Sequence, residues 1–150
     1  MSPKPDYLCF NLSLAMRRVA RRYEQVLSRY GLTAVQFLTL SVLWREDGLK
    51  FKDLAERLAI EGPTLTGTLD RLERAGYVER RDDPEDRRSL RVGITFKGWE
   101  IRAEAQAVAR TLEEHVRSAF TEEEFAAFSR VLEALPERIG VASPSSSSPA

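Results

Sequence analysis

The sequence predicts a mainly α-helical fold that carries one small β-hairpin. Apolar residues recur along most of the chain at the three- and four-residue spacing of amphipathic helices. The segments TAVQ and TEEE, which begin at Thr33 and Thr121, have the pattern of capping boxes that start helices. Between them, residues 90–95 alternate apolar side chains with other residues, as a strand does. A chain of 150 residues is long enough for one domain with a real apolar core.

Two helices are expected in the N-terminal part. Apolar positions at helical spacing run from Leu8 to Tyr30, and Gly31 marks a stop. Thr33 is the expected N-cap of a second helix, which reaches about Glu46. We expect residues 7–46 to form this helical part and residues 1–6 to be a flexible tail.

Residues 52–59 and 63–75 predict two short helices joined by the turn IEG. Gly62 is the expected N-cap of the second helix, Pro63 its first residue, and Gly76 its end. A helix pair with so short a turn is typical of a helix-turn-helix. On this fragment alone, an ordinary helical hairpin is equally consistent with the pattern.

A β-hairpin follows, with expected strands at residues 77–81 and 90–95 and a charged tip between them. We therefore expect residues 47–98 to form a winged helix-turn-helix. Two further helices are predicted: one at residues 99–118, which follows Thr95 as the expected N-cap, and one from Thr121 to Ile139. They make up an expected dimerisation region at 99–140, before a Ser- and Pro-rich tail at 141–150 that we expect to be disordered.

The second helix of the pair has the pattern of a DNA-recognition helix. Leu65, Leu69 and Leu72 form one apolar stripe, which turns the remaining face outward. In a helix-turn-helix protein this outer face enters the major groove, and hydroxyl side chains or a glycine allow close approach to DNA. The expected DNA-facing residues are Pro63, Thr64, Thr66, Gly67 and Arg71, together with Asp70.

The tip of the hairpin mixes arginines with acids, which a simple phosphate clamp would not include. Asp86 stands two residues before Arg88, and we expect its carboxylate to brace that guanidinium by a charge-assisted hydrogen bond. With Arg87 beside it, Arg88 would then project into a narrow minor groove. The alternative is a solvated turn whose charges only maintain solubility.

With these elements placed, the chain resembles the MarR family of winged-helix transcriptional regulators. The stretch DPEDRRSLRVGITFKG is similar to the family's wing signature, and TLTGTLDRLERAGYVERR to its recognition helix and following strand. The resemblance implies that Thr64, Thr66 and Gly67 lie on DNA and that Arg88 enters the minor groove. Lys50 departs from the family's usual Ser or Thr N-cap, and Gly67 lacks a side chain that many relatives use on DNA.

A homodimer is expected, because a hairpin and two short helices cannot cover the apolar stripes of the first and last helices. The resemblance also implies a dimer. Two-fold symmetry would place the recognition helices one DNA turn apart on a near-palindromic operator in double-stranded DNA.

The N-terminal segment LCFNLSLAMRR and the later SVLWRED resemble the organic-hydroperoxide sensors of the OhrR branch. This resemblance implies that Cys9 is a peroxide-reactive thiol and that Tyr23 of the other subunit hydrogen-bonds it. On one helix, Cys9 and Tyr23 would be about 21 Å apart. Ser13 and Ala34 replace further tyrosines of those sensors. The alternatives are a structural Cys9 and a phenolic or aromatic effector, to which Tyr7, Phe10 and Trp44 could contribute.

Other classes of function have weaker support in the sequence. The formal charge is zero, but residues 1–30 carry six bases against two acids, so individual faces can still attract a polyanion. His115 is the only histidine, and neither a nucleophile dyad nor a metal-ligand pattern is present, so we expect no enzyme, metal or cofactor. A single cysteine and the absence of a long apolar run predict a cytoplasmic protein without a membrane partner. A winged-helix adaptor that binds protein remains the alternative of another class.

Overall fold

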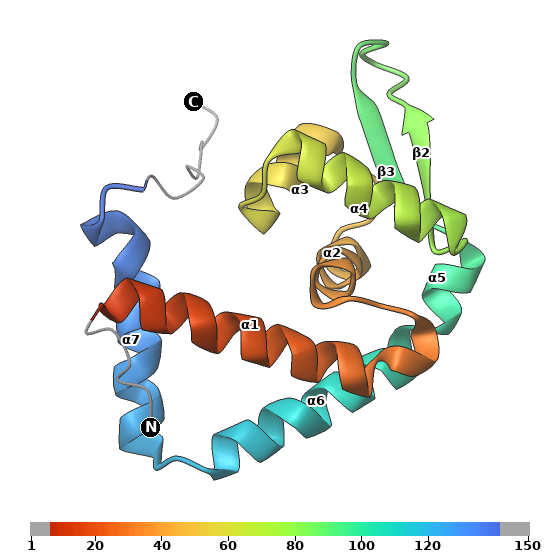
Figure 1. Cartoon of the computed structure of the whole chain (residues 1–150). Helices are drawn as coiled ribbons and strands as arrows, with labels where there is room; N and C mark the ends of the chain where they lie inside the picture. The colour runs from red at the N-terminus through yellow and green to blue at the C-terminus, as the bar shows by residue number, and fades with distance from the viewer. Residues whose placement is uncertain (1–6, 142–150) are drawn as a thin grey trace.

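The computed structural model describes residues 7–141, and it confirms a mainly helical fold with a small antiparallel sheet (Figure 1). The predicted tail at 1–6, and that at 141–150 beyond its first residue, lie outside the described residues. The elements are, in order, α1 (Leu8–Val26), η1 (Ser28–Tyr30), α2 (Ala34–Arg45), β1 (Leu49–Lys50), α3 (Phe51–Leu58), α4 (Gly62–Arg74), β2 (Val78–Asp82), β3 (Leu90–Ile94), α5 (Phe96–Glu100), α6 (Arg102–Ser118) and α7 (Glu122–Arg138).

Both predicted capping boxes are present. The Thr33 hydroxyl accepts the N–H of Gln36, whose side chain accepts the Thr33 N–H in return, and α2 begins there. Thr121 and Glu124 make the same reciprocal pair at the start of α7. Each box satisfies two backbone donors that a helix start would otherwise leave unpaired.

The end of the first helix and the start of α4 differ from the prediction. The first helix ends at Val26 and continues as the short 3₁₀ turn η1 up to Gly31, whose φ is 64°. The N-cap of α4 is Glu61, so that Gly62 and Pro63 are its first two residues. Proline fits either position, because the first backbone N–H groups of a helix have no partner within it.

The helix predicted from residue 99 begins earlier and is interrupted. Thr95 is its N-cap as expected, since its hydroxyl accepts the N–H of Gly98, and α5 starts at Phe96. The chain leaves helical bonding at Ile101 before α6. This break follows Gly98, whose carbonyl accepts the indole N–H of the buried Trp44 at 3.1 Å.

The sheet has three strands in the order β1-β3-β2, all antiparallel. The β2–β3 hairpin was predicted, and its register pairs Val78 with Ile94 and Asp82 with Leu90. Strand β1 was not predicted; it pairs Lys50 with Arg91 and attaches the start of α3 directly to the hairpin.

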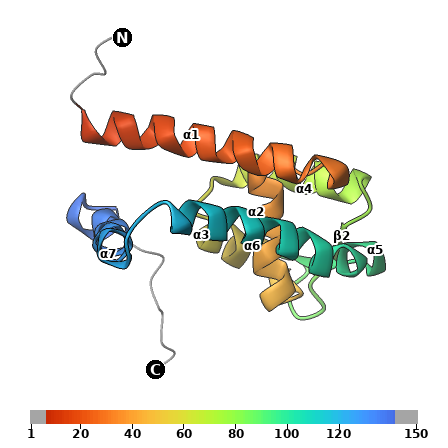
Figure 2. The same cartoon turned by 90° about the horizontal axis from the view of Figure 1, so that it is seen from below.

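One continuous core joins the winged unit to the other helices. It includes the buried leucines of α2, α3 and α4 and the buried residues of β2 and β3. Figures 1 and 2 show α2 between the winged unit and the pair formed by α1 and α6, so that α2 connects the two. No helix within residues 7–141 is both long and apolar enough to cross a bilayer.

Candidate nucleic-acid interface

Helix α4 separates a buried face from an exposed face, as the sequence predicts. Leu65, Leu69 and Leu72 are almost completely buried. The outer face carries Pro63, Thr64, Thr66 and Arg71, all exposed, and the half-buried Gly67. No atom lies within 4 Å of the place where a side chain would begin at Gly67, so the outer surface there is open.

Asp70 does not serve as a free outward group, which corrects the expectation for it. The guanidinium of Arg80 on β2 donates to Asp70 at 2.6 Å and to Glu73 at 2.5 and 3.1 Å. These charge-assisted bonds neutralise the acids of α4 and connect the helix to the first strand of the hairpin. We call Asp70, Glu73 and Arg80 the α4–β2 clamp. The sequence analysis placed Asp70 on the recognition helix but did not predict this contact.

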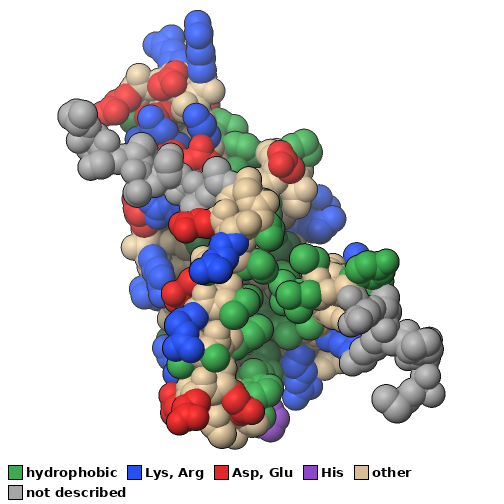
Figure 3. Space-filling model, turned by 90° about the vertical axis from the view of Figure 1, so that its left-hand side faces the viewer, with side chains coloured by type: hydrophobic (Ala, Val, Ile, Leu, Met, Phe, Trp, Pro, Cys, Tyr) green, Lys and Arg blue, Asp and Glu red, His purple; other side chains and the backbone are tan. Residues whose placement is uncertain are grey.

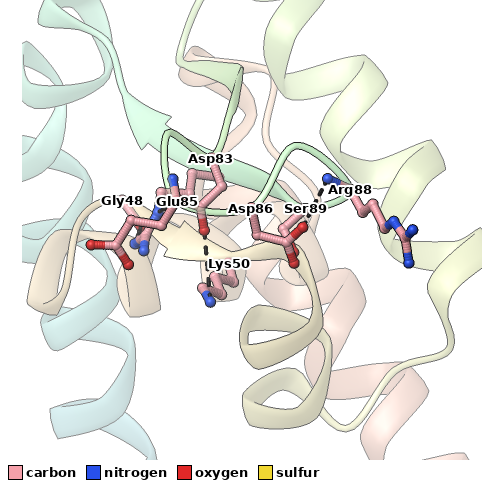
Figure 4. A network of polar contacts seen from close by, with 8 residues as sticks. Gly48, Lys50, Asp83, Glu85, Asp86, Arg88 and Ser89 are labelled. Carbon is pink, nitrogen blue, oxygen red and sulfur yellow. Dashed lines mark hydrogen bonds and ion pairs between the residues drawn. The ribbon is translucent and has the colours of Figure 1, made fainter.

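The turn at the hairpin tip is held by Asp86, but not in the predicted way. One carboxylate oxygen accepts the backbone N–H of Arg88 at 3.0 Å, and the other accepts the Ser89 hydroxyl at 3.0 Å. Figure 4 shows the guanidinium of Arg88 directed away from Asp86. The expected brace on the guanidinium is therefore wrong: a short carboxylate reaches the backbone N–H two residues later more easily than the end of a long side chain.

Asp83 is a second acid at the hairpin whose charge is used internally. It is only 1% exposed. It accepts the Glu85 N–H at 3.1 Å and lies 3.2 Å from the Nε of Arg91 and 3.7 Å from the Nζ of Lys50 (Figure 4). The bond from Glu85, and then Arg91 and Lys50, hold the pKa of Asp83 below its usual value although burial opposes this.

Basic side chains remain available on the same side of the molecule. Arg71, Arg87 and Arg88 are exposed and form no ion pair with any other described residue. A crevice of about 460 Å³ separates the start of α3 from the wing, and its lining includes Lys50, Lys52 and Arg88. A helix start and cations together favour phosphate oxygens, so this surface has the chemistry of a polyanion site.

The two predicted redox residues lie far from each other along α1. Cys9 is exposed in the first turn of the helix, whereas Tyr23 lies in its last turns. The Tyr23 hydroxyl donates to the Glu113 carboxylate, and its ring stacks on Phe37. Burial, followed by the Glu113 contact, raises the pKa of the Tyr23 hydroxyl. Within one chain, the fold therefore does not bring Cys9 and Tyr23 together.

A hollow that the sequence did not reveal lies beside Tyr23. It has a volume of about 410 Å³ and is lined by α1, α2 and α6, with Phe37, Ser41 and Arg110 among its residues. The aromatic candidates Tyr7 and Phe10 are exposed at the start of the chain, and Trp44 belongs to the core. In residues 7–141 no group of metal-ligating side chains comes together.

A helix-turn-helix with an exposed recognition face, followed by an antiparallel wing with free arginines, defines a winged-helix DNA-binding protein. The model of the MarR family matches residues 32–90, which span the region from α2 to the start of β3. The chain belongs to the MarR family, and is thus a DNA-binding transcriptional regulator and not an enzyme.

Curated relatives support this assignment. The chain is 31% identical to the organic hydroperoxide resistance transcriptional regulator of Bacillus subtilis over 107 residues, which are 71% of this chain and 73% of the relative. It is 36% identical to the transcriptional regulator TtmR of Methylorubrum extorquens over 70% of its own length. That match spans only about half, 54%, of TtmR.

Two solved structures of DNA complexes have the same fold. One is the transcriptional repressor CouR bound to a 23-mer DNA duplex, with 27% identity and a TM-score of 0.79 over 87% of this chain and 92% of CouR. The other is reduced AbfR bound to DNA, with 28% identity and a TM-score of 0.72 over 88% and 90%. AbfR has also been solved on DNA in an overoxidized form.

Proposed function

We propose that the protein is a cytoplasmic, homodimeric repressor that binds a near-palindromic operator. Helix α4 enters the major groove with Thr64, Thr66 and Gly67 towards the bases, and Pro63 and Arg71 flank them. Arg88, next to Arg87 on a turn held by Asp86, enters the minor groove. The observations that carry this proposal are that Asp70 and Glu73 of α4 and Asp83 and Asp86 of the wing have partners within the chain, whereas these arginines form no ion pair with a described residue.

The exposed apolar surface supports the dimer. In the isolated chain neither α1 nor α7 contains a buried residue. Figure 3 shows apolar side chains gathered on the side of the molecule where α1 and α7 lie. An apolar surface of this kind usually belongs to an interface. The exposed apolar residues of α1 and of the α6–α7 region are Leu8, Phe10, Met16, Val19, Val116, Phe120, Phe128, Val131, Leu132 and Ile139.

The proposal is tested by selecting duplexes from a random-sequence pool with the purified protein. We expect enrichment of a two-fold-related sequence whose half-sites lie one helical turn apart, because two copies of α4 read it. Affinity for the selected duplex should fall steeply with salt concentration. Failure to enrich any sequence, together with salt-insensitive retention of DNA, would favour the protein-binding adaptor.

Replacing the wing arginine tests the second contact. Arg88→Ala should weaken binding to the selected duplex by on the order of 1–3 kcal/mol and make the salt dependence less steep. The reason is that the substitution removes a guanidinium from the minor groove. Fluorescence anisotropy titrations at several salt concentrations measure both effects. Arg130→Ala is the matched control, since Arg130 is an exposed arginine on α7, away from the wing. Equal binding by Arg88→Ala and the wild type would remove the wing from the interface.

We also propose organic-hydroperoxide sensing through Cys9 as the signal that releases DNA. It is supported by the exposure of Cys9 on α1 and by the similarity to a relative named for organic hydroperoxide resistance. In this proposal the Tyr23 of the partner subunit approaches Cys9. No second cysteine is present in the chain, so a sulfenic acid at Cys9 would be capped by a small thiol or oxidised further.

Peroxide treatment distinguishes this sensor from a ligand-gated regulator. An organic hydroperoxide should release the wild-type protein from DNA and add mass at Cys9, whereas Cys9→Ser should stay bound. Anisotropy and intact-protein mass spectrometry report the two effects. Equal release of both proteins would assign Cys9 a structural role and favour a small aromatic effector, for which the hollow beside Tyr23 is a candidate site.

A further inference from the structure

Asp83 is the only buried charged side chain among the described residues, and it lies outside the proposed DNA contacts. It directly follows β2, where the chain leaves the sheet for the wing tip. Burying a carboxylate is costly unless cations and hydrogen bonds compensate it. A charge in this place therefore needs a reason other than the packing of a core.

The contacts of Asp83 join three segments of the winged unit. Its Oδ1 accepts the backbone N–H of Glu85 in the tip and faces the Nε of Arg91 on β3. Its Oδ2 has no hydrogen-bond partner within residues 7–141 and lies 3.7 Å from the Nζ of Lys50 on β1. Arg91 extends the contact to the body of the protein, since its Nη1 donates to the Gly48 carbonyl at 2.9 Å.

A short series of bonds leads from Asp83 to the wing arginine. The Asp83 N–H donates to the Ser89 carbonyl at 3.0 Å and closes the base of the tip. Ser89 donates its hydroxyl to Asp86, which accepts the N–H of Arg88. Every link in this series is a hydrogen bond between close neighbours, so the backbone at Arg88 is held relative to Asp83 (Figure 4).

We propose that Asp83 is a positioning residue for DNA binding, which fixes the root of the wing tip to β1 and β3 and so sets where Arg88 meets the minor groove. This inference rests on the proposed function. The depressed pKa of Asp83 agrees with it, because the carboxylate stays charged at neutral pH and retains both cations. Its partners Lys50 and Arg91 are partly exposed. Their contacts with Asp83 therefore stabilise the wing at the surface of the molecule and do not form part of the apolar core.

A double-mutant cycle tests the proposal on the full-length protein and the selected duplex. Asp83→Ala should weaken binding about tenfold, because the tip loses its attachment. In an Arg88→Ala background the same change should have almost no effect, since the group that Asp83 positions is already gone. Asp82→Ala is the matched control, because Asp82 is the exposed neighbour on β2, and it should bind as the wild type does.

Amide hydrogen exchange distinguishes local positioning of the wing tip from a general contribution of Asp83 to the stability of the fold. In Asp83→Ala, the amides of Arg88 and Ser89 should exchange faster while those of α4 keep their protection. Equal weakening by Asp83→Ala in both backgrounds, or loss of protection throughout α4, would overturn the proposal.

If Asp83→Ala does not fold, Arg91→Gln breaks the same attachment from the exposed side, and the cycle with Arg88→Ala is interpreted in the same way. The proposed function fails if the wild-type protein selects no duplex. The present inference alone fails if the wild type binds, Arg88→Ala weakens binding, and neither Asp83→Ala nor Arg91→Gln does.

Discussion

Two acids of the wing, Asp83 and Asp86, are engaged within the chain, which reduces the repulsion between DNA and a hairpin tip that carries both charges. Asp83 is buried between Lys50 and Arg91, and Asp86 accepts two bonds from the turn. The sequence analysis placed Asp86 and Arg88 in the tip of the hairpin, but their spacing alone could not show which atom of Arg88 the carboxylate contacts. The burial of Asp83 was equally hidden, because it depends on Lys50, a residue distant in the sequence.

Two substitutions at Asp86 separate the observed bond from the predicted one. Asp86→Asn keeps an oxygen that can accept the Arg88 N–H, so we expect DNA affinity close to that of the wild type. Asp86→Ala removes the acceptor and should weaken binding by about 1 kcal/mol through loss of the turn. Anisotropy titrations measure both. Equal damage by Asn and Ala would show that the negative charge itself is required.

At the scale of the elements, the sequence predicted those features that depend on hydrogen bonds between residues close together in the chain. The caps at Thr33, Thr95 and Thr121 fixed the starts of α2, α5 and α7, since each involves residues only three positions apart. Strand β1 was missed because two residues carry no periodic pattern, and only pairing with Val92 and Arg91 makes them a strand. The α4–β2 clamp was also not predicted, because it joins residues that are separated in the sequence and meet only when the hairpin packs on α4.

Two glycine substitutions should have opposite effects on stability. Gly67→Ala adds a methyl group to an open helix surface, so we expect a gain of about 0.5–1 kcal/mol in the free energy of unfolding. If α4 approaches DNA closely at Gly67, the same change should weaken binding. At Gly98 an added Cβ would lie 2.2 Å from the Tyr77 carbonyl oxygen, so Gly98→Ala should cost about 1–3 kcal/mol.

Urea unfolding measures the free energy of unfolding of both variants, and fluorescence anisotropy measures the affinity of Gly67→Ala for DNA. A Gly67→Ala protein that is more stable and binds DNA equally well would place Gly67 away from the duplex. A Gly98→Ala protein of unchanged stability would mean that α5 shifts freely on the β2–β3 hairpin.

At the scale of the whole molecule, the isolated chain divides its surface into a polar winged unit and an apolar end. The sequence predicted the apolar stripes of the first and last helices, and the structure leaves much of both exposed, although Tyr23 and Val26 at the end of α1 pack against the core. How a partner covers them could not be predicted, because the interface depends on two copies of a surface that is not contiguous in the sequence. The hollow beside Tyr23 is another feature that arises only when α1, α2 and α6 pack together.

A charge on α7 should dissociate the expected dimer. Phe128 is 53% exposed in the isolated chain, and Phe128→Glu would bury a carboxylate in an apolar interface. We expect a monomer that retains its helix content but binds the selected duplex at least tenfold more weakly, because one chain reads only one half-site. Analytical ultracentrifugation and circular dichroism provide the measurements. Glu133→Lys, at an exposed polar position of the same helix, is the control, and a dimeric Phe128→Glu would exclude this part of α7 from the interface.

The α4–β2 clamp has a consequence for how an effector can act. Arg80 on β2 holds α4 to the hairpin, so a tilt of α4 relative to the hairpin would break several charge-assisted bonds at once. If an effector acts near α1 of the proposed dimer, we therefore expect each winged unit to move as one block, which would change the distance between the two copies of α4. Release of DNA would then follow because the distance between the two copies of α4 no longer matches one turn of the duplex, while each winged unit keeps the shape that fits its own half-site.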